Sequence, residues 1–121
     1  MRANAIEAAE QCGILSIPAV DPDEAFSAAL QCLEPDRLVV FCDEDAPVAN
    51  PVEALGQARI GPAEKCAVVV GPEGGFTAEE RALALARPRV VRLSLGPRIL
   101  RADTAAVAVL TLVQAVLGDW R

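Results

Sequence analysis

The hydrophobic positions of the chain fall into short unbroken runs, separated by segments with a helical period. Two of the runs, Leu38–Cys42 and Cys66–Val70, contain only apolar residues and are rich in valine. Strands that are buried on both faces have this composition, which is typical of a parallel sheet. Val90–Leu95 predicts a further strand, and Leu15–Val20 predicts a short one.

Helical patterns lie between and before these runs. Apolar residues recur on one side of Arg2–Cys12 and of Asp23–Leu33, a weaker helix lies near Val52–Ala58, and residues 78–86 predict a helix that ends before Pro88. Helices that alternate with buried strands predict an α/β fold, with a mostly parallel sheet flanked by helices in a three-layer sandwich. The chain shows no internal boundary and predicts one domain over residues 1–121.

The last predicted helix, Thr104–Leu117, is apolar nearly all round, and only Thr111 and Gln114 interrupt its apolar residues. A helix without a polar face is either buried on several sides or spans a membrane. At ~1.5 Å per residue the apolar run is roughly 20 Å long, shorter than the ~30 Å core of a bilayer. The helix therefore predicts burial against protein and no membrane. One sheet face in so small a domain cannot cover it, so a second subunit is expected to contribute.

The chain is acidic, and its charges are unevenly distributed. Residues 1–60 carry 3 basic and 11 acidic side chains, residues 61–121 carry 8 and 6, and the net charge is −6. An acidic domain binds RNA poorly without specific contacts, because phosphate contacts supply most of that affinity. A local basic face would have to come from the C-terminal half. Its candidates are Arg81, Arg87, Arg89, Arg92, Arg98 and Arg101, the first four of which are alternatively solvated surface residues.

The cysteines predict neither a zinc site nor disulfide bonds. They stand at positions 12, 32, 42 and 66, never as C-x-x-C, in a chain without histidine. We therefore expect buried, reduced thiols, no metal, and a cytoplasmic protein. Met1 and Arg2 are followed by an amphipathic helix and not by the apolar run of a signal peptide.

Two glycine-containing turns follow predicted strands, at Gly71–Phe76 and at Leu95–Ala105. Thr77 and Glu80 have the spacing of a capping box, so a helix is expected to begin at Ala78. Neither a phosphate-binding loop nor the G-x-G-x-x-G dinucleotide motif is present. Such turns meet at the carboxyl edge of a parallel sheet, where ligands bind. The pair predicts a pocket lined mostly by backbone, although a single turn of this kind is commonly only structural.

These two segments resemble the signatures of the RsmE family, which are bacterial 16S ribosomal RNA uridine-N3 methyltransferases of the SPOUT superfamily. The run Glu7–Gly13, followed by Pro18, resembles the entry into the catalytic domain of that family. The order and spacing agree over nearly the whole chain. The resemblance implies a homodimeric enzyme that methylates a uridine N3 in small-subunit ribosomal RNA with S-adenosylmethionine, and a C-terminal trefoil knot.

The resemblance implies that the cofactor is held at the two turns, chiefly by backbone. The implied binding residues are Gly71, Pro72, Glu73, Gly74, Gly75, Leu95, Gly96, Ile99 and Leu100, and Phe41 closes the pocket from the end of the preceding strand. Uracil N3 must lose a weakly acidic proton before it is methylated. With no His or Tyr in the chain, the candidate acceptors are Glu73 and Asp103, and Arg98 or Arg101 would stabilise the anion. Asp103 is alternatively the N-cap of the last helix.

The chain also departs from the RsmE pattern. Asp103 and Ala102 stand where the family usually has Glu and Thr, and Ile14 stands where it typically has Arg. The chain starts inside the linking helix, so the RNA-binding β-barrel domain of the family is expected to be absent. Two other hypotheses remain: a noncatalytic, cofactor-binding dimerisation module without its RNA-binding domain, and a SPOUT enzyme acting on tRNA ribose, which the second signature disfavours.

Overall fold

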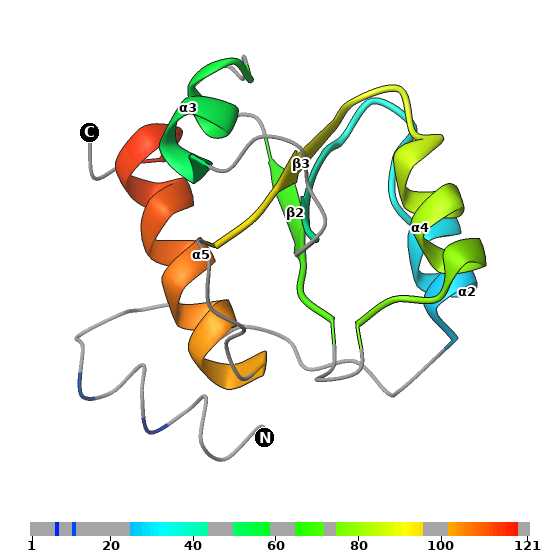
Figure 1. The fold of residues 1–121 in the computed structure, drawn as a ribbon, viewed down its shortest axis with the longest axis horizontal. Helices are drawn as coiled ribbons and strands as arrows, with labels where there is room; N and C mark the ends of the chain where they lie inside the picture. Colours follow the sequence, from blue (N-terminus) through cyan, green and yellow to red (C-terminus); the bar gives the residue numbers. More distant parts are fainter. Residues whose placement is uncertain are drawn as a thin grey trace.

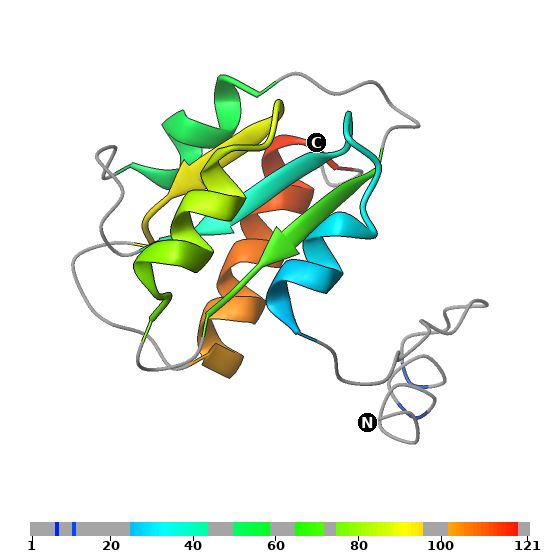
Figure 2. The same ribbon diagram turned by 90° about the vertical axis from the view of Figure 1, so that its right-hand side faces the viewer.

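Three parallel strands form the centre of the structure, a computed structural model that describes residues 7, 11, 25–43, 50–58, 65–71, 75–95 and 102–118. The strands are β1 (Leu38–Cys42), β2 (Cys66–Val69) and β3 (Val90–Leu93), in the order β2-β1-β3. Helices cover both faces of this sheet, as Figures 1 and 2 show. The predicted parallel sheet and the three-layer arrangement are confirmed. The strand bounds agree with the prediction for β1, whereas β2 and β3 end earlier than predicted.

The middle strand, β1, is the most deeply buried element. Residues 38–41 are all buried, because β1 has a neighbour on each side and a helical layer on each face. Val39 pairs with Ala67 of β2 and with Val90 of β3, and Phe41 pairs with Val69 and Arg92. The unbroken apolar run in the sequence thus reflects burial on both faces of a parallel strand.

One face of the sheet is covered by α3 (Pro51–Gly56) and α5 (Ala102–Val116) (Figure 1). The even-numbered β1 residues Leu38 and Val40 point to this face, together with Leu93 of β3. Leu55 of α3 and Val109 of α5 meet them, and both are fully buried. This cluster is the larger of the two cores.

The other face is covered by α2 (Phe26–Gln31) and α4 (Ala78–Leu85) (Figure 2). Val39 and Phe41 point to it, in keeping with the period of two along a strand. The ring of Phe76 lies between Phe41, at a centroid distance of 4.6 Å, and Phe26, at 5.6 Å. Three tilted rings therefore link the carboxyl end of the middle strand to both helices of this layer.

The starts of two helices follow from local sequence. Asn50 is the N-cap of α3: its Oδ1 accepts hydrogen bonds from the backbone N of Val52 at 3.0 Å and of Glu53 at 3.3 Å. Proline at the first helical position is favourable there, because its missing N–H would have no partner inside the helix. In α4, Thr77 and Glu80 form the predicted capping box. The weak helix predicted near 52–58 is confirmed, with its start at Pro51.

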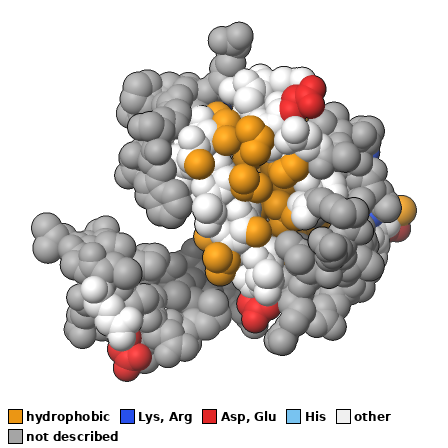
Figure 3. Space-filling view, turned by 60° about the vertical axis from the view of Figure 1, so that its left-hand side comes forward, with side chains coloured by type: hydrophobic (Ala, Val, Ile, Leu, Met, Phe, Trp, Pro, Cys, Tyr) orange, Lys and Arg blue, Asp and Glu red, His pale blue; other side chains and the backbone are white. Residues whose placement is uncertain are grey.

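The last helix buries one stripe and exposes another. Ala105, Val109, Val113 and Leu117, spaced by four, are buried. Val107 is 69% exposed and Leu110 is 52% exposed, so apolar side chains also face outward. Figure 3 shows hydrophobic side chains gathered on this side of the molecule. None of the helices in the described ranges is long and apolar enough to cross a membrane.

Some predictions fall on segments that the structure does not describe. Of the predicted helix Arg2–Cys12, only Glu7 and Gln11 are described, and both are helical and exposed. The strand predicted at Leu15–Val20 lies outside the described residues. So does most of the Leu95–Ala105 turn, and the trefoil knot therefore stays a prediction.

Candidate functional site at the carboxyl edge of the sheet

The three strands end at one edge, and both glycine-containing turns start there. Asp43 follows β1, Gly71 follows β2 by two residues, and Leu95 follows β3 by two residues. Because β1 lies between β2 and β3, the turns emerge on either side of Asp43. The predicted meeting of the two turns at the carboxyl edge is confirmed for their first residues. This edge is where open parallel sheets bind ligands.

Gly71 is required by a close contact within the protein. A Cβ built on Gly71 would lie 2.7, 2.9 and 3.2 Å from three atoms of the Phe76 ring. That ring is held between Phe26 and Phe41 and cannot easily move. Gly71 does not have a positive φ. The first glycine of the turn therefore makes room for an aromatic ring.

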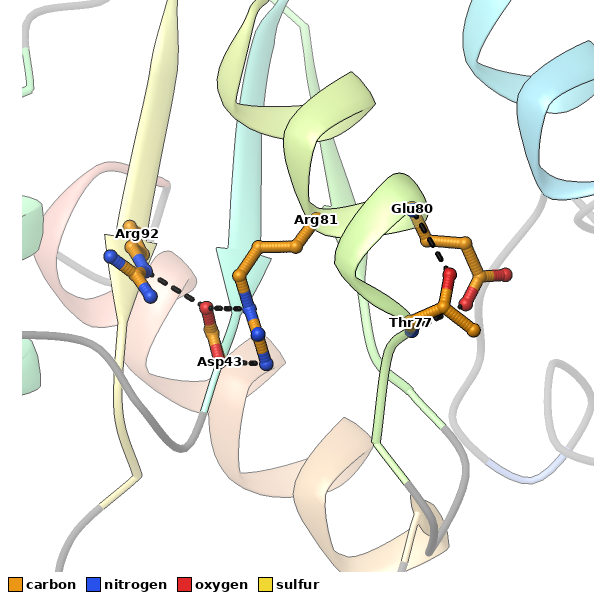
Figure 4. Close-up of polar contacts among 5 residues, drawn as sticks. All are labelled: Asp43, Thr77, Glu80, Arg81 and Arg92. Carbon is orange, nitrogen blue, oxygen red and sulfur yellow. Dashed lines mark hydrogen bonds and ion pairs between the residues drawn. The ribbon is translucent and has the colours of Figure 1, made fainter.

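Gly75 has a φ of 75°, a backbone conformation that residues with a Cβ rarely adopt. It stands two residues before Thr77, whose Oγ1 accepts from the Glu80 backbone N at 3.1 Å. The Glu80 carboxylate in turn accepts from the Thr77 backbone N at 2.9 Å. Gly75 thus lies in the turn that leads from the sheet edge into α4. Figure 4 shows the contacts between Thr77 and Glu80 that cap the start of this helix.

We expect Gly75→Ala to lower the free energy of unfolding by about 1 kcal/mol, because the new Cβ strains a positive φ. Gly56→Ala is the matched control, since a Cβ at Gly56 meets nothing within 4 Å and the residue is helical. The control should be neutral or slightly stabilising. Urea denaturation measures both variants, and equal stability of the two would show that the turn does not need this conformation.

The most deeply buried charge among the described residues is Asp43, whose side chain is 1% exposed. Arg81 of α4 donates from Nε to Asp43 Oδ2 at 2.9 Å and from Nη2 to Oδ1 at 3.3 Å. Arg92 of β3 donates from Nε to the same Oδ2 at 2.8 Å. Figure 4 shows the two arginines approaching the carboxylate from different elements. We call these three residues the Asp43 cluster.

Sequence reasoning missed Asp43. The available signal was an acidic residue placed directly after a strand buried on both faces. A carboxylate at that position enters the protein interior and is stable there only with partners. The arginines that pair with it lie 38 and 49 residues away along the chain, beyond the reach of any local pattern.

The other described arginines of the C-terminal half, Arg87 and Arg89, make their contacts at the amino edge of the sheet. Arg87 donates to the carbonyl oxygens of Leu30 at 3.1 Å and Glu34 at 2.6 Å. Arg89 donates to the carbonyl oxygen of Asp36 at 3.2 Å. These carbonyls precede β1, at the amino edge of the sheet. The hypothesis of one basic face is wrong for these residues, and their interpretation as merely solvated is also wrong.

The structure describes five of the residues predicted for the site. Phe41 is fully buried against Phe76, and Leu95 packs at the edge of the larger core. Gly71 and Gly75 have the roles given above. Asp103 is the second residue of α5 and is therefore not its N-cap; its Oδ1 accepts from the Thr104 backbone N at 2.8 Å. The other predicted site residues lie outside the described ranges; they are Pro72, Glu73, Gly74, Gly96, Arg98, Ile99, Leu100 and Arg101.

The described thiols are free, and two of them are protonated at neutral pH. Burial raises the pKa of the Cys42 thiol to about 12, and burial also raises the pKa of Cys66. A protonated thiol is a poor nucleophile. Cys32 is exposed, so the expectation of buried thiols is wrong for that residue. Within the described ranges, no group of three His, Cys, Asp or Glu residues could hold a metal ion.

Comparison with known proteins places the chain among RNA methyltransferases. Residues 1–114 match the family model described as RNA methyltransferase domain. Ribosomal RNA small subunit methyltransferase E of Rickettsia conorii is 30% identical over 114 residues, covering 94% of this chain and 45% of that protein. The Buchnera aphidicola (Schizaphis graminum) protein of the same name is 28% identical, covering 94% and 44%.

Solved structures agree with this placement. Ribosomal RNA small subunit methyltransferase E from Neisseria gonorrhoeae, bound to S-adenosyl methionine, matches with a TM-score of 0.80 and 29% identity, covering 99% of this chain and 47% of that one. A Legionella pneumophila methyltransferase in complex with its cofactor SAM matches with a TM-score of 0.73 and 29% identity, covering 94% and 44%. The chain thus spans less than half the length of these relatives.

Proposed function

This chain belongs to the RsmE family of RNA methyltransferase domains, and from that premise we propose that it methylates N3 of a uridine in small-subunit (16S) ribosomal RNA with S-adenosylmethionine. The observation that carries the proposal is that both signature turns start at the carboxyl edge of a parallel sheet. Two similar structures carry S-adenosylmethionine.

The residues at this edge suit such a cofactor. Val70 and Leu95 are partly buried apolar side chains at the two strand ends, and they suit an adenine ring. The turns after them supply backbone N–H and C=O groups for its polar edges. We assign the cofactor to Gly71–Gly75 and Leu95–Leu100. When bound, S-adenosylmethionine supplies a methyl group activated by a positively charged sulfur.

The residues of the chain then have to prepare uracil N3. Asp103 lies in the first turn of α5, at the end of the second signature segment. We propose Asp103 as the group that takes the N3 proton, with Glu73 as the alternative acceptor. Arg98 and Arg101, on the connection that leads into α5, stabilise the uracil anion.

We also propose that the chain acts as a cytoplasmic homodimer. The outward stripe of α5, with Val107 and Leu110, leaves an apolar face without cover from the described residues (Figure 3). A second subunit that packs on this face would bury it. The chain spans less than half the length of its relatives. One alternative therefore remains, a noncatalytic cofactor-binding and dimerisation module that needs a separate RNA-binding domain.

Calorimetric titration with S-adenosylmethionine, followed by methyl transfer to small ribosomal subunits, tests the proposal. Arg98→Ala and Arg101→Ala should leave cofactor affinity within about threefold while transfer falls roughly tenfold or more, the pattern of an interaction made mainly in the transition state. Arg37→Ala is the control, because Arg37 pairs with Glu34 before β1, at the amino edge of the sheet.

Three outcomes decide between the alternatives. Loss of transfer in the two signature variants, with normal transfer by Arg37→Ala, supports the proposed roles. Cofactor binding without transfer by the wild type supports the noncatalytic module. Absence of cofactor binding by the wild type overturns both.

A further inference from the structure

The Asp43 cluster brings a second guanidinium group to a carboxylate that already has a bidentate partner. Arg81 alone already contacts both oxygens of Asp43, a bidentate arrangement that satisfies the carboxylate. Arg92 adds a third hydrogen bond, to an oxygen that is already paired. The Arg92 guanidinium group is thus additional to an ion pair that is already bidentate.

Arg92 also has N–H groups that are not used in the contact with Asp43. It is bonded through Nε to Asp43, and its Nη1 and Nη2 groups donate to no residue within the described ranges. The side chain is 28% exposed, and neither Nη is among the buried unpaired atoms. Its terminal donors therefore face solvent, while the inner end of its guanidinium group is fixed by a buried anchor.

A guanidinium group that is held in this way is prepared for a phosphate. Its two Nη groups can donate together to two phosphate oxygens, whereas Nε remains on Asp43. Fixing the side chain before binding lowers the entropy that is lost when the ligand arrives. In the sheet, Arg92 pairs with Phe41 and stands three residues before Leu95, so it lies near the carboxyl edge at which the turns start.

The charge of the whole chain makes such a site necessary for RNA. With a net charge of −6, the protein repels a polyanion unless positive charge is placed where the RNA lies. Arg87 and Arg89 are used on backbone carbonyls at the other edge. Arg92 places a partly exposed guanidinium group near the carboxyl edge.

We propose that Arg92, positioned by Asp43, binds a backbone phosphate of the RNA next to the target uridine. The inference rests on the proposed function for the identity of the RNA. Asp43 is a positioning residue, because it acts on the RNA through Arg92 and does not touch it.

The test measures binding of a fluorescent single-stranded, uridine-rich RNA oligonucleotide at several salt concentrations, without cofactor. Arg92→Gln should weaken binding about threefold to tenfold and reduce the slope of log affinity against log salt by roughly 0.7, the loss of one phosphate contact. Arg89→Gln removes the same charge at the amino edge and should leave the slope unchanged. Affinity for S-adenosylmethionine should stay within about twofold in both variants.

The conservative variant separates charge from geometry. Arg92→Lys should restore the salt slope but not the full affinity, because one ammonium group cannot bind Asp43 and both phosphate oxygens as a guanidinium does. An unchanged slope in Arg92→Gln, or the same loss in Arg89→Gln, overturns the inference. Weaker cofactor binding with normal RNA binding also overturns it and assigns Arg92 to the cofactor carboxylate.

The RNA-binding and methyl-transfer measurements together distinguish a failure of this inference from a failure of the proposed function. If Arg92→Gln shows the expected change in slope while the wild type transfers no methyl group, the phosphate site stands and the methyltransferase assignment fails. If wild-type transfer is normal and Arg92→Gln binds RNA as the wild type does, the assignment stands and the phosphate site fails.

Discussion

Val109→Asp should prevent the protein from folding. Val109 is fully buried in the core between α5 and the sheet, among Val40, Leu55 and Leu93. An unpaired carboxylate in such a place costs several kcal/mol, of the same order as the ~5–15 kcal/mol that holds a whole domain together. Circular dichroism and urea denaturation of the purified variant should show loss of the cooperative transition.

Val107→Asp is the matched control, since it makes the same change two residues earlier in the same helix. Val107 is 69% exposed, so its carboxylate stays in water and the fold should persist. If α5 forms the dimer interface, this variant should be monomeric by light scattering, whereas the wild type should have about twice the mass of one chain. A wild-type mass of one chain at micromolar concentration would argue against the dimer, and a folded Val109→Asp would contradict the core.

The sheet could be predicted from the sequence because its signal is local. A strand buried on both faces needs apolar residues at every position, and Leu38–Cys42 meets that requirement without interruption. The start of α4 was equally predictable, since Thr77 and Glu80 satisfy each other's backbone groups within one turn. In both cases, the residues that form the sequence pattern are the same residues that make the contacts in the strand or the helix start.

The orientation of α5 could not be predicted in this way. Its sequence is apolar on nearly all sides, so periodicity does not say which stripe faces the sheet. Packing against α3 and the strands decides it, and puts Val109 inside and Val107 outside. Val109 and Val113 both lie in the core between α5 and the sheet.

The sequence predicted those parts of the candidate site that belong to a sequence motif, and it did not predict the others. The two turns stand out as sequence blocks, but the reason for Gly71 is its contact with the ring of Phe76 at the other end of the same turn, which only the folded structure shows. The Asp43 cluster has no motif, because its members come from β3, from α4 and from the residue after β1, and they meet only after the sheet has formed. Pairs of charges that are distant in the chain leave no periodic pattern.

Asp43→Asn should lower the free energy of unfolding by about 3 kcal/mol or more, because it leaves two partly buried guanidinium groups facing a neutral amide. The change keeps the shape of the side chain, so loss of charge and not a cavity is what it measures. Urea denaturation at low and high salt should give nearly the same loss, since the Asp43 side chain is 1% exposed and salt screens a buried carboxylate weakly.

The exposed pair between Arg37 and Glu34 provides the comparison. Its Nε–Oε2 distance is 2.6 Å, as short as those in the Asp43 cluster, yet the Glu34 side chain is 60% exposed. Glu34→Gln should therefore change the free energy of unfolding little, because water replaces the lost partner.

Arg92→Gln should lower the free energy of unfolding less in the Asp43→Asn background than in the wild type, since the hydrogen bond it removes is already weakened. If the two effects instead add fully, the arginine does not depend on the aspartate, and Asp43 does not position Arg92.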